Sequence, residues 1–143
     1  MTTVPQSPDE MRVKHLELLQ ATIGRLGTNS FLIKGWTMAL TGGLIAAAMG
    51  GAGWVGALIA LMMTSGLWLL DTYYLGQERL FRSLYERSAA PGAAQTPLFS
   101  MDTDRYAQSV PWRIVALSRT MSLFYGTLVL ADVVVALALL AGP

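Results

Sequence analysis

Residues 35–70 read GWTMALTGGLIAAAMGGAGWVGALIALMMTSGLWLL, a run of 36 residues without Asp, Glu, Lys or Arg. A helix of about 20 apolar residues crosses the hydrocarbon core of a bilayer, so this run is too long for one span. The Gly-rich segment 50–53 interrupts it near its middle and predicts a turn. We therefore expect a helical hairpin that crosses a membrane twice, at 31–49 and at 54–70.

A second apolar run fills the C-terminal end of the chain. Residues 120–143 contain a single Asp, Glu, Lys or Arg, which is Asp132. Pro111 suits the first turn of a helix, so one helix is predicted over 111–141, with a third span beyond Arg119. Because 53% of the residues are hydrophobic and 13% are charged, the chain is too apolar for an ordinary soluble domain. The predicted fold is an all-α membrane protein, a single domain with three transmembrane helices.

Helices should also extend from the spans into the aqueous phase. Ser7, Pro8 and Glu10 supply an N-cap, a Pro at the first helical position and the partner of a capping box, so a helix is predicted over 7–30. Gly24 and its neighbours predict a bend just before the membrane. One apolar stripe on this helix predicts packing against another cytoplasmic helix, with a membrane surface as the alternative partner. The stripe consists of Leu16, Leu19, Ile23 and Leu26.

The second span should continue beyond the membrane as a helix. No breaker follows Leu70, so this extension is predicted over 71–88, with Glu78 and Arg82 spaced for an i,i+4 pair. Residues 89–110 form a polar connection to the last helix. Its two nearby carboxylates, Asp102 and Asp104, are expected to lie in a solvated turn, because they lack the further ligands that a cation site needs.

Basic residues are confined to two parts of the chain. All ten Lys and Arg lie at 12–34 and 79–119, whereas the turn near residue 51 and the tail after residue 140 have none. The positive-inside rule therefore places the N-terminus in the cytoplasm and the C-terminus across the membrane. A signal peptide cleaved near Ala48 is disfavoured, because the apolar run continues past that residue into a second segment.

The chain lacks the residues on which many catalytic and metal-binding sites depend. The chain has no Cys, and His15, which is expected to be exposed, is its single His. A zinc site or a Cys/His pair cannot be built within one chain from these residues. The sequence also has no P-loop and no GxGxxG motif. We therefore expect no enzyme activity and no cofactor.

The first span carries a small residue at every fourth position. Such a stripe lets two helix backbones approach closely, and close packing drives helix association in a bilayer. The second span, in which Gly56, Ala60 and Thr64 repeat the spacing, is the expected partner. The alternative is that Gly and Ala are simply frequent in membrane helices. The helix-packing residues predicted on the first span are Gly35, Ala39, Gly43, Ala47 and Gly51.

The last apolar run contains an acidic residue about halfway along it. A carboxylate at mid-membrane costs roughly 2.5–3.5 kcal/mol, and such residues usually face a protein interior or water. Helical projection gives a polar stripe that ends in this acid and predicts the lining of a pore within a ring of identical subunits. The alternatives are a hydrogen bond between helices and a position in the outer interface. The predicted pore-lining residues are Ser118, Ser122, Tyr125 and Asp132.

Short motifs at the membrane boundaries carry a resemblance to a known family. They are Asn29-Ser30-Phe31, Lys34-Gly35-Trp36, Leu70-Asp71, Tyr73-Tyr74-Leu75 and the segment from Gln77 to Tyr85, with softer likeness at Phe99-Ser100-Met101 and Ser122-Leu123-Phe124-Tyr125. The chain resembles small bacterial inner-membrane proteins of antiphage defence systems. The resemblance implies a toxic membrane effector held inactive by a partner, such as the channel component of the nucleotide-signalling system Hailong. It identifies no ligand-binding residues.

These features predict a homo-oligomeric membrane effector that conducts ions and is held shut by its cytoplasmic helices. Its expected partners are the lipid bilayer, other copies of the chain and a cytoplasmic regulatory protein or nucleotide-derived ligand. The alternative is a non-conducting anchor that scaffolds a partner through residues 9–30 and 71–110. A small multidrug-type transporter is disfavoured, because such transporters commonly lack the strong charge bias seen here.

Overall fold

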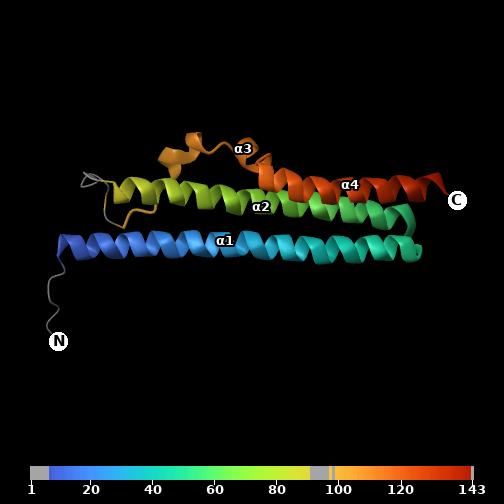
Figure 1. Ribbon diagram of the computed structural model, residues 1–143, viewed down its shortest axis with the longest axis horizontal. Coiled ribbons are helices and arrows are strands. Elements are labelled where there is room, and N and C mark those ends of the chain that lie inside the picture. Colours follow the sequence, from blue (N-terminus) through green and yellow to red (C-terminus); the bar gives the residue numbers. More distant parts are fainter. Residues whose placement is uncertain (1–6, 91–96, 98, 143) are drawn as a thin grey trace, which may run out of the picture.

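The computed structural model describes residues 7–90, 97 and 99–142, and this part of the chain is all-helical without a strand (Figure 1). This confirms the all-α prediction. The elements follow in the order α1 (Pro8–Ala47), the π-helical turn η1 (Ala48–Ala52), α2 (Gly53–Ala89), the 3₁₀ helix η3 (Asp104–Ser109), α3 (Trp112–Ala116) and α4 (Arg119–Ala141).

The capping box predicted at the start of the first helix is confirmed. The backbone N–H of Glu10 donates to Ser7 Oγ at 3.2 Å, and the backbone N–H of Ser7 donates to Glu10 Oε2 at 3.0 Å. Pro8 occupies the first turn, where a missing N–H costs nothing. The helix start is therefore determined by local sequence.

The predicted bend near Gly24 is wrong, because α1 runs as one helix of 40 residues from Pro8 to Ala47. A Gly inside a helix costs only about 1 kcal/mol relative to Ala, and packing along a neighbouring helix easily exceeds that. Here α2 accompanies α1 over its length (Figure 1). Thr28 Oγ1 also donates to the carbonyl of Gly24 at 3.0 Å within this part of the helix.

The chain reverses direction at the predicted Gly-rich segment. Gly51 and Gly53 have φ angles of 127° and 64°, which L side chains rarely adopt. The turn makes α1 and α2 antiparallel, so residues equally distant from it face each other. The hairpin tip and the C-terminal end of α4 lie at the same end of the molecule (Figure 1).

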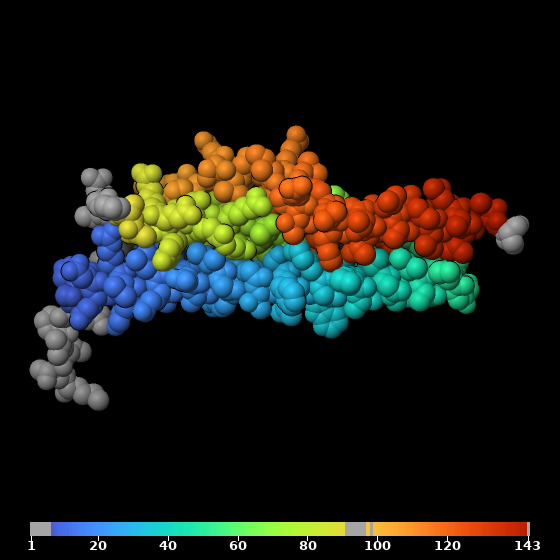
Figure 2. Space-filling view, in the orientation of Figure 1, coloured from blue at the N-terminus to red at the C-terminus, as the bar shows by residue number. Residues whose placement is uncertain are grey.

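The last helix packs antiparallel on α2 and contacts α1 less (Figure 1). In the space-filling view α4 covers the part of α2 next to the turn and borders α1 (Figure 2). The predicted single helix over 111–141 is divided, because the chain leaves helical geometry at Leu117 and Ser118 adopts an extended conformation (ψ 150°) as the N-cap of α4. Trp68 of α2 donates its indole N–H to the freed carbonyl of Ala116 at 3.2 Å. A tertiary hydrogen bond thus stabilises a helix break at which the sequence has neither Pro nor Gly.

Two helical stretches are long and apolar enough to cross a membrane: Pro8–Ala89, which folds back at Gly51, and Arg119–Ala141. Only 22% and 11% of their most apolar windows are buried inside the chain. A core helix of a soluble protein would be mostly buried, whereas these helices expose large side chains such as Trp36, Met62 and Leu123.

Candidate functional site

Polar side chains occupy the interior of the bundle, which soluble and membrane proteins alike normally fill with apolar groups. The buried set on α1 includes Ser30, Thr37 and Thr41, and α2 contributes Thr64 and Asp71. They form two hydrogen-bonded clusters at different heights along the helices. We call these the Asp71 cluster and the Asp132 cluster.

In the Asp71 cluster one carboxylate joins all three long helices. Asp71 of α2 is completely buried and accepts from Lys34 Nζ at 2.6 Å and Ser30 Oγ at 2.5 Å, both on α1. The Tyr125 hydroxyl of α4 donates to the same carboxylate at 3.0 Å. Lys34 Nζ also donates to Ser30 Oγ at 2.8 Å, so the cluster is closed on itself. Each donor offsets part of the cost of burying the carboxylate.

Aromatic contacts position the tyrosine of this cluster. Trp68 stacks on Tyr125 with ring centroids 5.8 Å apart and planes inclined by 2°. Phe124 meets Tyr125 edge to face at 5.0 Å. Such pairs contribute about 0.5–1.5 kcal/mol beyond area burial. The phenol is therefore held toward Asp71 from two sides.

The Asp132 cluster lies one to two helical turns closer to the hairpin tip. Thr64 Oγ1 donates to Asp132 Oδ2 at 2.8 Å, and the hydroxyls of Thr41 and Thr64 are 2.8 Å apart. A hydroxyl has one proton, so Thr64 accepts from Thr41 while it donates to Asp132. Asp132 is 0% exposed, and its Oδ1 has no partner among the described residues. The cluster thus holds a carboxyl group that is only half satisfied.

The predicted polar stripe of the last helix is divided by the structure. Tyr125 and Asp132 point into the interior of one chain, where they belong to the two clusters. Ser122 is half-buried outside them. Ser118 occupies the N-cap position of α4, but its hydroxyl makes no capping hydrogen bond and has no partner among the described residues. In this arrangement Asp132 forms the interhelical hydrogen bond considered as an alternative. A pore-lining role requires α4 to move and stays a prediction.

The small residues predicted to pack on the second span lie instead on the outer face of α1. All five are exposed, and a Cβ added at Gly35, Gly43 or Gly51 would meet nothing within 4 Å. The expected packing of this stripe against α2 therefore does not occur within the chain. The buried face of α1 carries Thr37 and Thr41 instead. Thr41 bonds to Thr64 of α2, and Thr37 donates to the carbonyl of Ile33 on its own helix, so both buried hydroxyls have partners.

The matching residues of the second span are in a helix contact, as expected. Gly56 and Ala60 are buried, and a Cβ added at Gly56 would lie 3.1–3.2 Å from atoms of Ala48 and Ala52. That distance is tighter than ordinary side-chain contacts. The close approach of the two helix backbones next to the turn thus depends on Gly56.

The place of Asp71 in a buried cluster was not predicted from the sequence, which put this residue at the start of a cytoplasmic helix. The signal was the hairpin register: Lys34 and Asp71 are equally distant from the turn, and so are Thr41 and Thr64. In an antiparallel pair such residues lie at the same height. A basic and an acidic residue at matching heights therefore indicated an ion pair across the hairpin.

The N-terminal part of α1 is tied to the end of α2 and to the connection that follows it. Arg12 Nη2 donates to the carbonyls of Ser88 and Ala90, both at 3.0 Å, at the end of α2. His15, predicted to be exposed, is 2% exposed, and its Nδ1 accepts the backbone N–H of Phe99 at 2.8 Å. Burial lowers the pKa of His15 below its ordinary value of 6.5. The neutral imidazole required for this hydrogen bond is thus favoured.

Other predicted polar features have simpler outcomes. The i,i+4 ion pair between Glu78 and Arg82 is formed. Asp102 Oδ1 accepts the backbone N–H of Asp104 at 3.0 Å in an exposed turn. Within the described residues no group of three or more His, Asp or Glu gathers that could hold a metal ion.

Comparison with known proteins gives no further guide to the role of these clusters. No family model matches the chain, and neither a curated protein nor a solved structure does so. The function of the chain is therefore inferred from its sequence features and from the geometry of the two clusters.

Proposed function

We propose that the chain crosses a bacterial inner membrane three times, at 31–49, at 54–70 and along α4. The exposed apolar side chains of these segments support this proposal, since lipid would cover them. The charge bias supports a cytoplasmic N-terminus and a C-terminus on the outer side. The cytoplasmic part would comprise the first turns of α1, the last turns of α2 and the connection to α3.

Within that membrane we propose an ion-conducting assembly of several copies. The observation that carries this proposal is the half-satisfied carboxyl group of Asp132, buried midway along an apolar helix. An acidic residue at this depth is costly and usually marks an ion or proton pathway. Three short helices enclose no water-filled path alone, so the path requires further subunits.

The arrangement described above corresponds in this proposal to the closed state. Thr64 and Asp71 of α2 hold the polar face of α4 inside the chain through Asp132 and Tyr125. Opening would turn α4 about its axis so that this face meets the same face of other copies. A ring of carboxylates would then favour cations over anions.

The exposed small-residue stripe of α1 supports an oligomer. Within the part of the chain that the structure describes, no atom would meet a Cβ added at Gly35 or Gly43, so this face is open to another backbone. Small residues permit the close helix approach that stabilises association in lipid. We therefore assign the stripe to the contact between subunits, in place of the contact between the first two spans.

The cytoplasmic helices are the proposed control element. Arg12 and His15 tie α1 to the end of α2 and to the connection that leads to α4. A regulatory protein or nucleotide-derived ligand bound here could shift α4 through that connection. The resemblance to antiphage membrane effectors supports a role in defence, in which opening harms the infected cell.

The second candidate function is a non-conducting membrane anchor. The length of α1 and α2 beyond the spans favours it, because these paired helices offer a long rigid surface to a cytoplasmic partner. An anchor needs no buried acid in its last span, however. The cost of burying Asp132 favours the conducting assembly.

Purified full-length protein in liposomes separates the two functions. We expect cation flux from wild-type protein, and a reduced or inverted cation preference from Asp132→Asn, which keeps the hydrogen bond from Thr64. Thr127→Val is the matched control, since its hydroxyl bonds only to carbonyls of its own helix. Absence of flux from wild-type liposomes under every condition, from a protein that is monomeric in detergent, would favour the anchor.

A further inference from the structure

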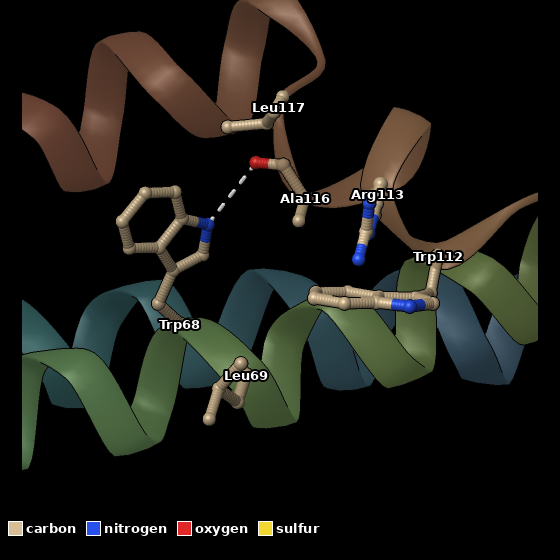
Figure 3. A pocket seen from close by; sticks show the side chains of 6 residues that line it. All are labelled: Trp68, Leu69, Trp112, Arg113, Ala116 and Leu117. Carbon is tan, nitrogen blue, oxygen red and sulfur yellow. Dashed lines mark hydrogen bonds between the residues drawn. The ribbon is translucent and has the colours of Figure 1, made fainter.

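A groove opens on the outer side of α2, where α3 approaches it (Figure 3). Its volume is about 310 Å³. The lining residues are Trp68 and Leu69 of α2, Trp112, Arg113 and Ala116 of α3, and Leu117 at the break before α4. The wall is apolar except for Arg113, so the groove combines a hydrophobic surface with one cation.

The break between α3 and α4 creates this groove. A continuous helix over 111–141 would keep one axis, whereas the corner at Leu117 offsets α3 from α4. The indole N–H of Trp68 donates to the carbonyl of Ala116 and fixes the corner (Figure 3). The groove is therefore a built feature of the fold.

The cation of the groove is available to a ligand. The guanidinium carbon of Arg113 lies 5.8 Å from the centre of the Trp112 ring, over its face. Among the described residues no carboxylate lies within ion-pair distance of Arg113, and it makes no hydrogen bond through its side chain. An anion would therefore meet a positioned and uncompensated charge.

The height of the groove matches the cytoplasmic boundary of the proposed membrane. Trp68 and Leu69 lie three and two residues before Asp71, which pairs with Lys34 at the predicted entry of the first span. Arg119 begins α4 on the same side of the chain. Trp and Arg at this height are typical of the headgroup region, where one end of a ligand is charged and the other apolar.

We propose that this groove binds one anionic phospholipid of the cytoplasmic leaflet, its phosphate on Arg113 and part of an acyl chain against Trp68 and Leu117. The volume is at the low end of ligand pockets, roughly 300–1,000 Å³, so the groove encloses only part of the lipid. This inference goes beyond ion conduction and rests on the proposed crossing of the membrane. Charge complementarity favours an anionic lipid over a zwitterionic one.

The test uses full-length protein with Trp36 and Trp54 replaced by Phe, so that Trp68 and Trp112 report by fluorescence. It is placed in phosphatidylcholine vesicles that contain either brominated phosphatidylglycerol or brominated phosphatidylcholine as quencher. We expect about fivefold preferential quenching by the anionic lipid, which corresponds to one basic side chain near the surface. Arg113→Gln should abolish the preference, and Arg113→Lys should retain part of it.

Arg105→Gln is the control, because Arg105 is an exposed cation of η3 outside the groove. Equal quenching by both lipids in the two-tryptophan protein that keeps Arg113 would overturn the lipid site. An unchanged preference for the anionic lipid in Arg113→Gln would overturn it too. No lipid preference in the protein that keeps Arg113, together with an altered oligomer size in Arg113→Gln, would overturn it as well and assign the groove to another copy. Failure of the proposed membrane crossing gives a different result. In the wild-type protein, which keeps Trp36 and Trp54, neither brominated lipid would then quench the fluorescence of these two residues.

Discussion

The ion pair between Lys34 and Asp71 should be strongly coupled, so that losing one member costs far more than losing both. Asp71→Leu leaves Lys34 without its counter-ion and removes the acceptor of Ser30 and Tyr125. Breaking a buried pair by removing one partner costs about 3–5 kcal/mol. The Lys34 side chain is 21% exposed and can reach water, so we expect a loss near 3 kcal/mol, at the lower end.

The double variant Lys34→Met/Asp71→Leu removes both charges and keeps similar volumes. Replacing a buried pair by apolar residues is often neutral, so its stability should lie within about 1 kcal/mol of the wild type. A remaining loss arises from the hydroxyls of Ser30 and Tyr125, whose acceptor is gone. Since each single variant should cost about 3 kcal/mol or more, the double variant should be about 5 kcal/mol more stable than the sum of the single losses, and this difference is the coupling energy.

Unfolding in detergent micelles titrated with sodium dodecyl sulfate, followed by circular dichroism, measures these differences. Lys34→Met is the other single variant of the cycle. It should cost more stability than Asp71→Leu, because it leaves the fully buried carboxylate of Asp71 without its counter-ion and out of reach of water. Additive losses in the double variant would refute the reasoning, because they would mean that the two side chains do not interact. A wild-type stability of Asp71→Leu would refute it as well.

Three further predictions address the turn, the outer face and the cytoplasmic contacts. Gly51→Ala should destabilise the hairpin by about 1–3 kcal/mol in the same unfolding assay, because φ is 127° there, whereas Gly50→Ala should be mild. Gly43→Leu should leave the fold intact but reduce oligomer size by light scattering, unlike Leu at Ala46, off the stripe. Burial lowers the pKa of His15, so its contribution to stability should be complete above pH 6.5, its ordinary pKa, and be lost as pH falls toward the folded-state pKa. The measurement is the protection factor of the Phe99 amide against hydrogen exchange, which should fall in acid.

Local signals of the sequence predict the elements of the fold well. The capping box at Ser7 and the Gly-rich turn near Gly51 each act within a few residues, so their outcomes follow from the chain alone. The bend near Gly24 and the uninterrupted helix over 111–141 were wrong for the opposite reason. Both depend on a distant helix: α2 straightens α1, and Trp68 stabilises the break at Ala116.

The facing of side chains was predicted less well than the elements. Spacing by four finds both a small-residue stripe and a threonine stripe on α1, and spacing alone does not say which of them meets α2. Desolvation decides between them. Buried hydroxyls at Thr41 and Thr64 satisfy each other, whereas a glycine face loses little when it stays exposed to lipid or to another copy.

The cost of leaving buried polar groups without partners also connects the two polar clusters to the proposed function. Each cluster contains one hydrogen bond between α2 and α4, from Tyr125 to Asp71 and from Thr64 to Asp132. Among the described residues α4 makes no other side-chain hydrogen bond to another helix. Apolar contacts between helices in lipid change little when a helix turns, because lipid replaces what is lost. The hydrogen bonds do not have that replacement. They therefore hold the orientation of α4, and a signal that supplies other partners for Asp132 and Tyr125, such as water in a shared path, would release it.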